Sequence, residues 1–328
     1  MDERGGIKMG QPIIYLYEQL KEDQIETIRQ SAPDYIIIDA KRESLQVVED
    51  DIEIMLGWDK EIGTRLLNSE TSRLKWVQSI SAGVDTYDLE RFSEKDILLS
   101  NASGIHSISI SEHVLGVLLA EFRGIRTSIN NQANTEWTRD NISYQQLSLK
   151  KMLIVGTGQI GQQLAHFAQG LGMQTYGVNT SGHVTNGFIE CYSHKNMSRI
   201  VNEMDIVVNI LPLTDETFQM YNERMFLAMK PGTVFVNVGR GPSVNTDDLI
   251  QALNTGQLSF AALDVFEEEP LAENSPLWGM KNVLITPHIS GLTPGFKTKL
   301  LTIFMQNLRQ YCKDGTLAKN EIALNKGY

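Results

Sequence analysis

The sequence predicts an α/β protein built from two doubly wound parallel sheets, one of which is inserted into the chain of the other. Short apolar runs typical of strands alternate with longer stretches typical of helices along almost the whole chain. Such alternation favours parallel sheets covered by helices on both faces. The length of 328 residues also suits two domains at roughly 150 residues each.

The first series of strands occupies the N-terminal third of the chain. The expected strands are Ile13–Tyr17, Tyr35–Ile38, Ile52–Leu56, Trp76–Ile80 and Ile97–Leu99. The pattern then changes to one long apolar helix over residues 109–126, capped by Ser109 or Ser111. Its most apolar part, residues 114–120, is far shorter than the ~18–20 residues of a membrane span and predicts a buried helix.

A second series follows the long helix. The expected strands are Met152–Val155, Thr175–Val178, Ile206–Ile210, Thr233–Val238, Phe260–Val265 and Val283–Ile285. Pro231-Gly232 breaks a helix before the fourth of these strands. Thr293 as N-cap and Pro294 at the first helical position predict a last helix through Tyr311.

No strand follows that last helix, so we expect it to return to the first series. This predicts a discontinuous domain of residues 1–106 and 294–328, with residues 107–293 as the inserted domain.

Composition excludes several classes of protein. Hydrophobic residues make up 41% and charged residues 21%, which is ordinary for a soluble protein and excludes a mainly disordered or collagen-like chain. The formal net charge of −11 argues against nucleic-acid binding, because phosphate recognition draws on a surplus of Lys and Arg. Two cysteines, Cys191 and Cys312, suggest neither a disulfide framework nor a metal site.

The N-terminus gives little sign of targeting. The segment before Met9 is polar and lacks the apolar region of a secretory signal, and it is either native or a leader remnant. We therefore expect a cytoplasmic protein with no membrane partner.

A glycine fingerprint opens the second series. Residues 156–161 read GTGQIG, between an apolar strand and an apolar helix, which is the context that a dinucleotide site requires. Gly156 permits the tight turn, Gly158 lets the backbone approach a pyrophosphate, and Gly161 lets helix and strand pack closely. The helix N-terminus, including Gln159 and Ile160, faces the negative charge. A Rossmann-like domain is expected here, and incidental glycines are the alternative.

The loop after the next strand bears on the choice between NAD and NADP. An acidic residue there would bind the ribose 2′-hydroxyl and repel a 2′-phosphate, but this chain has the neutral Asn179. Thr180, Ser181 and His183 are able to donate hydrogen bonds to a phosphate, although no arginine accompanies them. A polar loop that accepts either cofactor is an equal alternative, so both NAD and NADP stay open.

Three later segments place polar residues just beyond apolar strands, where ligands bind in open α/β sheets. Arg240 in NVGRG is suited to hold a carboxylate and a carbonyl oxygen through its guanidinium fork. His288 in ITPHISG is suited to exchange a proton near neutral pH, and Glu269 in ALDVFEEEP to hydrogen-bond that imidazole and favour its protonated form. Taken singly, each has a structural alternative, namely a surface ion pair, a loop histidine and a solvated turn. Their combination after a dinucleotide fingerprint favours catalysis.

With these motifs the chain resembles the D-isomer-specific 2-hydroxyacid dehydrogenase family. The matching segments run through nearly the whole chain: SAGVD (81–85), SEHVLGVLLAEFR (111–123), IVGTGQIG (154–161), LPLT (211–214), FVNVGRG (235–241), ALDVFEEEP (262–270) and SPLW…NVLITPHISG (275–291). The resemblance implies two Rossmann-like or flavodoxin-like domains, with the NAD(P)-binding domain inserted into the substrate domain. It also implies a homodimer formed through the inserted domain, to which the helix near residues 107–126 contributes.

The resemblance further implies a role for each site residue. Arg240 binds a 2-keto acid, Glu269 supports the histidine, and His288 is the general acid/base in reversible reduction to a D-2-hydroxy acid. The backbone amides of Ala82, Gly83 and Val84 receive the substrate carboxylate. The remaining expected cofactor contacts are Asp264 at the nicotinamide carboxamide, Leu211, Pro212 and Thr214 on the adenosine side, and Val238.

Differences from the family pattern limit the range of candidate substrates. The stretch at residues 55–59 lacks the arginine-containing loop usual in phosphoglycerate dehydrogenases, and no regulatory domain follows. Glu269 argues against a formate dehydrogenase, which carries glutamine there. Trp58 resembles a substrate-facing tryptophan of glyoxylate/hydroxypyruvate reductases, with core packing as an equal alternative. Together with Met55, it would suit small or moderately apolar 2-keto acids.

Alternatives remain open for the role of His106 and for the function of the whole protein. His106 either reaches the site or serves as a hinge. A corepressor-like dinucleotide sensor on the same fold is the main alternative to an enzyme, although disordered extensions are absent from this sequence. Two further alternatives are a methyltransferase and a structural protein without activity on the same fold. Neither would require Arg240, Glu269 and His288 together.

Overall fold

The computed structural model describes residues 10–42, 49–140 and 142–325 of the chain. The chain divides into two compact units, Met1–Ile105 with Pro294–Tyr328, and His106–Thr293. The N-terminal segment discussed above as native or leader lies outside the described residues.

The first unit is built on a five-stranded parallel sheet with the strand order β2-β1-β3-β4-β5. Its strands are β1 (Ile13–Leu16), β2 (Ile36–Asp39), β3 (Ile52–Leu56), β4 (Trp76–Gln78) and β5 (Leu98–Ser100). Its helices are α1 (Glu22–Ser31), α2 (Lys60–Asn68), α3 (Leu89–Glu94) and the C-terminal α10 (Phe296–Asp314). All five expected strands are present.

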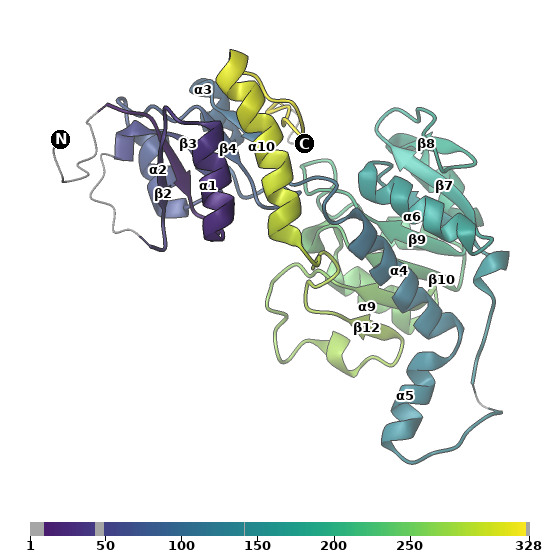
Figure 1. Cartoon of the computed structure of the whole chain (residues 1–328). Coiled ribbons are helices and arrows are strands. Elements are labelled where there is room, and N and C mark those ends of the chain that lie inside the picture. Colours follow the sequence, from purple (N-terminus) through teal and green to yellow (C-terminus); the bar gives the residue numbers. More distant parts are fainter. Residues whose placement is uncertain (1–9, 43–48, 141, 326–328) are drawn as a thin grey trace. The chain divides into compact units, whose positions relative to one another are not determined.

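The return of the last helix to the first unit is confirmed. Helix α10 lies beside α1 (Figure 1), and its apolar face, with Leu300, Phe304 and Leu308, is buried in the same core as Trp76. The predicted start of this helix is wrong by a few residues. Gly295, with φ of +68°, precedes the first helical residue, so Thr293 and Pro294 lie before the helix rather than at its cap.

The second unit is built on a seven-stranded parallel sheet with the strand order β12-β11-β10-β9-β6-β7-β8. Its strands are β6 (Lys151–Val155), β7 (Gln174–Asn179), β8 (Cys191–Ser193), β9 (Ile206–Asn209), β10 (Thr233–Asn237), β11 (Leu258–Leu263) and β12 (Val283–Ile285). Its helices are α4 (Ser107–Phe122), α5 (Ile125–Ala133), α6 (Gln159–Gly170), α7 (Met197–Ile200), α8 (Glu223–Ala228) and α9 (Thr246–Asn254). Six of the strands were expected, and the short edge strand β8 was not.

Two buried clusters cover the faces of this sheet, as the strand–helix alternation predicts. One includes Leu153, Val207 and Phe235, and the other includes Ile154, Val208 and Val236. Neighbouring residues of each strand thus point to opposite faces, and both faces are apolar, which is the pattern of a parallel sheet between helices.

The long helix differs from the expectation at both ends. Helix α4 begins at Ser107, and neither Ser109 nor Ser111 caps it. The Ser111 hydroxyl donates to the Ser107 carbonyl oxygen within the helix (2.7 Å). Gly124, with φ of +69°, then separates α4 from α5, so residues 109–126 are not one helix. The expected burial of the middle of α4 is confirmed by Val114, Val117 and Leu118.

Short 3-10 turns complete the described structure at Glu49–Asp51, Leu147–Leu149, His194–Asn196, Val201–Glu203, Gly241–Ser243 and Pro276–Gly279. Among the described residues, no helix combines the length and the apolar composition needed to cross a membrane.

Candidate active site

The candidate site residues of the second unit follow the ends of parallel strands. Residues 156–158 follow β6, Asn179 ends β7 and residues 180–183 follow it, and residues 210–214 follow β9. Residues 238–241, 264–269 and 286–291 follow β10, β11 and β12. Because every ladder in this sheet is parallel, all six loops emerge at one edge.

The glycine loop has the geometry that the motif predicts. Gly156 has φ of +114°, a conformation that favours glycine. A Cβ on Gly161 would lie 2.0 Å from the Gly156 carbonyl oxygen, so only glycine allows this approach of helix and strand. A Cβ on Gly158 would meet open space instead, which leaves its backbone accessible to a ligand.

Helix α6 begins at this loop with Gly158 as its N-cap, and no side chain caps it. The amides of its first turn, including those of Gln159 and Ile160, point out of the helix end, where the dipole favours an anion. The residues present therefore fit the pyrophosphate of a dinucleotide.

Asn179 organises the loop after β7. Its side-chain oxygen accepts hydrogen bonds from the amides of Gly182 (2.7 Å) and His183 (3.1 Å), and its Nδ2 donates to the His183 carbonyl oxygen (2.9 Å). Thr180 and Ser181 are exposed on this loop. Asn179 therefore shapes the loop. Thr180 and Ser181 are on its exposed side, where Ser181 Oγ lies 3.0 Å from His183 Nδ1.

The loops after β9 and β10 approach each other closely. A Cβ on Gly239 would lie 2.7 Å from the Leu211 carbonyl oxygen. Leu211, Pro212 and Thr214 are all half-buried. The Val238 side chain packs in the core, so only its backbone is free to face a ligand.

His288 and Glu269 form the central pair of the site. The His288 Nδ1 lies 2.7 Å from Glu269 Oε2, and the Phe266 amide donates to Glu269 Oε1 (3.0 Å). The His288 side chain is 52% exposed, so the ring nitrogen opposite Glu269 is accessible to a small ligand. Glu267, in the same acidic run, accepts hydrogen bonds from Thr246 at the start of α9 instead.

Buried polar side chains hold the backbone of Arg240. The Arg240 carbonyl oxygen accepts hydrogen bonds from Ser243 Oγ (2.6 Å) and Asn237 Nδ2 (3.1 Å). Asn209 Nδ2 donates to both Asn237 Oδ1 (3.0 Å) and Ser243 Oγ (2.9 Å). The side chains of Asn209, Asn237 and Ser243 are all buried. Their hydrogen-bond network therefore holds the backbone of the loop that carries Arg240.

Asp264 is 1% exposed and accepts several hydrogen bonds from the segment that carries His288. Its Oδ1 accepts from Thr286 Oγ1 (2.6 Å) and the Ile289 amide (2.9 Å), and its Oδ2 accepts from the Ser290 amide (2.9 Å). Burial by itself would raise the pKa of Asp264, but the hydrogen bonds from Ser290, Thr286 and Ile289 outweigh burial and keep the pKa below its ordinary value.

The first unit holds the remaining candidates. Ala82 and Gly83 are half-buried and Val84 is buried, just beyond β4. The Ala82 carbonyl oxygen accepts from Asn101 Nδ2 (2.7 Å) and the Gly83 carbonyl oxygen from Ser81 Oγ (2.7 Å). These bonds fix the carbonyls of the loop, while the amides of residues 82–84 donate to no partner within the described ranges.

Trp58 and Met55 differ from each other in exposure. Trp58 is half-buried in an aromatic cluster, with ring centroids 5.4 Å from Tyr87 and 5.5 Å from Phe92. Met55 is fully buried in β3, so the expectation that it lines a pocket is wrong, because its side chain points into the core.

The sequence analysis did not identify several residues that shape the site. Asn209 and Asn237 end β9 and β10, and Thr286 directly follows β12, so a polar residue at a strand end was the signal that could have found them. Ser243 had no such signal. Gly241 is the clearest case, because its Cβ would lie 1.8 Å from the Phe266 carbonyl oxygen. That contact brings the Arg240 loop against the loop of Glu269.

Comparison with known proteins identifies the family. The sequence model described as D-isomer specific 2-hydroxyacid dehydrogenase, NAD binding domain, matches residues 115–290, more than half of the chain. The chain belongs to the D-isomer specific 2-hydroxyacid dehydrogenase family.

Individual relatives span nearly the full chain. A glyoxylate/hydroxypyruvate reductase B of Escherichia coli strain SMS-3-5 is 30% identical over 90% of this chain and 94% of its own length. A structure of a D-isomer specific 2-hydroxyacid dehydrogenase family protein from Aeromonas salmonicida is 34% identical, with a TM-score of 0.81 over 96% of this chain and 99% of that one. A phosphoglycerate dehydrogenase structure from Lactobacillus plantarum is 38% identical, with a TM-score of 0.57 over 94% and 99% of the two chains.

Membership of this family confirms three expectations from the sequence. The fold is α/β with two parallel sheets, the protein is an enzyme of the NAD(P)-dependent D-2-hydroxyacid dehydrogenase class, and its cofactor is NAD or NADP.

The close approach at Gly241 yields a test of the site geometry. We expect Gly241→Ala to force the loops of Arg240 and Glu269 apart, because the new methyl group would overlap the Phe266 carbonyl. Overpacking of this kind typically costs about 1–3 kcal/mol of folding free energy. A displacement of about 1 Å at the site is able to lower turnover by about 100-fold. Thermal unfolding and steady-state kinetics measure the two effects.

Gly279→Ala is the matched control, because a Cβ there meets open space. Equal behaviour of the two variants would contradict the account of Gly241.

Proposed function

We propose that the protein reduces a small 2-keto acid to its D-2-hydroxy acid with NADH or NADPH, and that His288 is the general acid/base. The observation that carries this proposal is the 2.7 Å contact of His288 Nδ1 with Glu269 Oε2, at the sheet edge that also bears the glycine loop. We assign the second unit to cofactor binding and the first unit to substrate binding.

The pairing with Glu269 determines which ring nitrogen of His288 exchanges a proton with the substrate. A carboxylate accepts hydrogen bonds, so His288 Nδ1 carries its hydrogen toward Glu269 and leaves Nε2 to give or take the mobile proton. The negative charge of Glu269 also compensates the imidazolium that forms when Nε2 is protonated. His288 thereby protonates the oxygen on C2 during reduction and accepts that proton during oxidation.

The other residues bind and polarise the substrate. When bound, the reduced nicotinamide supplies the hydride for C2. The guanidinium of Arg240 holds the substrate carboxylate and carbonyl oxygen and stabilises the charge that develops on that oxygen. The amides of Ala82, Gly83 and Val84 receive the carboxylate. Glyoxylate, hydroxypyruvate, pyruvate and branched-chain 2-keto acids are the candidate substrates, with Trp58 either at the pocket or in the aromatic packing of the first unit.

The relatives include enzymes named for unphosphorylated and for phosphorylated substrates. The E. coli relative is named a glyoxylate/hydroxypyruvate reductase, whereas the L. plantarum structure is a phosphoglycerate dehydrogenase. The stretch at residues 55–59 contains no arginine to receive a phosphate. A phosphorylated 2-keto acid therefore belongs in the substrate panel as the expected poor substrate. A cytoplasmic location stays a prediction.

Replacement of the histidine tests the mechanism. His288 has φ of +53°, so His288→Asn is preferable to alanine, because asparagine tolerates this conformation. We expect kcat to fall about 10²–10⁴-fold, as for loss of a general acid, while dissociation constants for NADH and NADPH stay unchanged. Absorbance of the reduced nicotinamide measures turnover across the 2-keto acids.

The exposed His166 on α6 provides the control, and His166→Asn should keep full turnover. Undiminished turnover of His288→Asn would contradict the assignment of His288 as the general acid/base. No turnover of the natural protein with any 2-keto acid, despite cofactor binding, would favour the sensor-like alternative.

The loop after β7 supports acceptance of NADPH. Between Asn179 and Gly187 no carboxylate is present to repel a 2′-phosphate. We expect Thr180→Asp to raise KM for NADPH at least tenfold and to leave KM for NADH within about twofold, because the new charge opposes only the phosphate. Thr180→Asn is the uncharged control. A parallel loss with both cofactors would place Thr180 away from the 2′-position.

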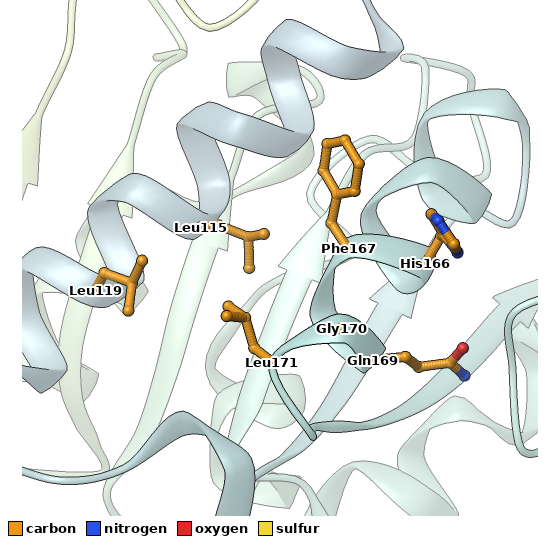
Figure 2. Close-up of a pocket in the computed structure, with 7 residues that line it drawn as sticks. All are labelled: Leu115, Leu119, His166, Phe167, Gln169, Gly170 and Leu171. Atoms are coloured by element: carbon orange, nitrogen blue, oxygen red, sulfur yellow. The ribbon is translucent and has the colours of Figure 1, made fainter.

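We propose further that the protein is a homodimer formed through the second unit. A pocket of about 570 Å³ is lined by residues of α4 and of the C-terminal part of α6. Figure 2 shows among them Leu115 and Leu119 of α4, Phe167 of α6, and Leu171, which directly follows α6. Helix α5, which follows α4, buries none of its residues within the unit, and Ile125 and Ile129 on it are exposed. A second copy of the chain is the occupant that would cover both surfaces.

Introduction of a negative charge at exposed apolar positions tests the dimer. We expect Ile129→Glu and Leu171→Glu to convert a dimer to a monomer of 36.8 kDa in sedimentation, because a buried unpaired carboxylate opposes association. Leu227→Glu, at an exposed leucine on α8, should leave the dimer intact. A monomeric natural protein would refute the proposal.

A further inference from the structure

Three polar side chains at the start of α4 contact the segment that carries His288. They are His106, Ser109 and His113, whose spacing of three and four residues places them on one face of the helix. Their partners are as follows: His106 Nδ1 with the Gly291 carbonyl oxygen (2.7 Å), Ser109 Oγ with Thr293 Oγ1 (3.0 Å), and His113 Nε2 with Thr286 Oγ1 (3.2 Å). This polar face of α4 therefore lies along residues 286–293, on both sides of His288.

The direction of the hydrogen bonds at His113 follows from a count of protons. The Thr286 hydroxyl has one hydrogen, and it lies 2.6 Å from Asp264 Oδ1, which only accepts when ionised. The hydroxyl therefore donates to Asp264, and His113 Nε2 must donate to the hydroxyl. Burial lowers the pKa of His113 despite the nearby charge of Asp264, which is consistent with a neutral ring protonated at Nε2.

The chain of donors ends on the carboxylate that fixes the His288 segment. Asp264 accepts the amides of Ile289 and Ser290, and its own carbonyl oxygen accepts the His288 amide (2.9 Å). The left-handed backbone of His288, with φ of +53°, needs such support because non-glycine residues adopt it at a cost. Each donor in a chain of this kind polarises the next, so His113 strengthens the bond between Thr286 and Asp264.

We propose that His113 is a positioning residue for the reaction, acting through Thr286 and Asp264 to hold His288 in its working orientation. This inference rests on the proposed function of His288. His113 contacts neither His288 nor Glu269 in the hydrogen bonds of the site, so its effect passes through the backbone of residues 286–290.

Four variants separate positioning from simple packing. His113→Leu removes the donor and keeps an apolar side chain, and His113→Gln restores an N–H donor. Thr286→Val removes the hydroxyl at constant shape, and the double variant His113→Leu/Thr286→Val tests whether both act in one chain. Ser111→Ala is the matched control, because it removes a buried hydroxyl of α4 that bonds only within the helix.

The kinetic measurement is the primary deuterium isotope effect on kcat, obtained with the reduced nicotinamide cofactor deuterated at C4. We expect His113→Leu and Thr286→Val each to lower kcat roughly three- to tenfold and to raise the isotope effect, with KM for the cofactor unchanged. The double variant should be no worse than Thr286→Val alone, and His113→Gln should recover most of the loss. A variant that merely lost folded protein would lower kcat without moving the isotope effect.

Amide hydrogen exchange tests the same chain without turnover. Exchange at Ile289 and Ser290 should accelerate in His113→Leu and Thr286→Val and stay unchanged in Ser111→Ala. Unchanged exchange, additive kinetic losses or an unmoved isotope effect would each overturn the proposal. If the variants exchange as expected but the natural protein turns over no 2-keto acid, the proposed function fails and this inference about the reaction fails with it. If His288→Asn abolishes turnover while His113→Leu has no effect, the inference alone fails.

Discussion

The parallel register of the seven-stranded sheet is the constraint on which the site depends. A parallel ladder makes every strand end at the same edge, so residues from six distant stretches of sequence emerge together. The three adjacent strands β9, β10 and β11 are ended or followed by buried polar side chains, namely Asn209, Asn237 and Asp264. Burial of such groups is costly unless they are hydrogen-bonded, and each of them is bonded to the backbone of a site loop.

Two kinds of close approach complete the arrangement. Gly161 and Gly241 both face backbone carbonyls at distances that no side chain tolerates. The first approach fixes the glycine loop against its helix, and the second fixes the Arg240 loop against the loop of Glu269. Gly158 is different, because the space around it is open. The same residue type thus serves packing at two positions and ligand access at another.

The hydrogen-bond network also separates residues that look alike in the sequence. Glu269 bonds His288, while Glu267, two residues away, bonds the start of α9. Asp264 holds backbone amides around His288, and the polar face of α4 reaches the same segment from the other side. The geometry of the candidate site in this unit is therefore set by backbone positions as much as by the side chains of His288 and Glu269.

The sequence by itself determined the parallel α/β class, eleven of the twelve strands in the described residues, the glycine loop and the family resemblance, because these depend on local periodicity and short motifs. It missed strand β8, since three half-buried residues carry no apolar pattern. It misplaced the helix boundaries near Gly124 and Gly295, where a left-handed residue rather than a capping side chain decides. The sequence also named Glu269 as the partner of His288, and the structure pairs these two residues. Only the tertiary structure decided that Met55 is core and that His113 reaches Thr286. Those outcomes depend on contacts between residues far apart in the sequence, which no local pattern encodes.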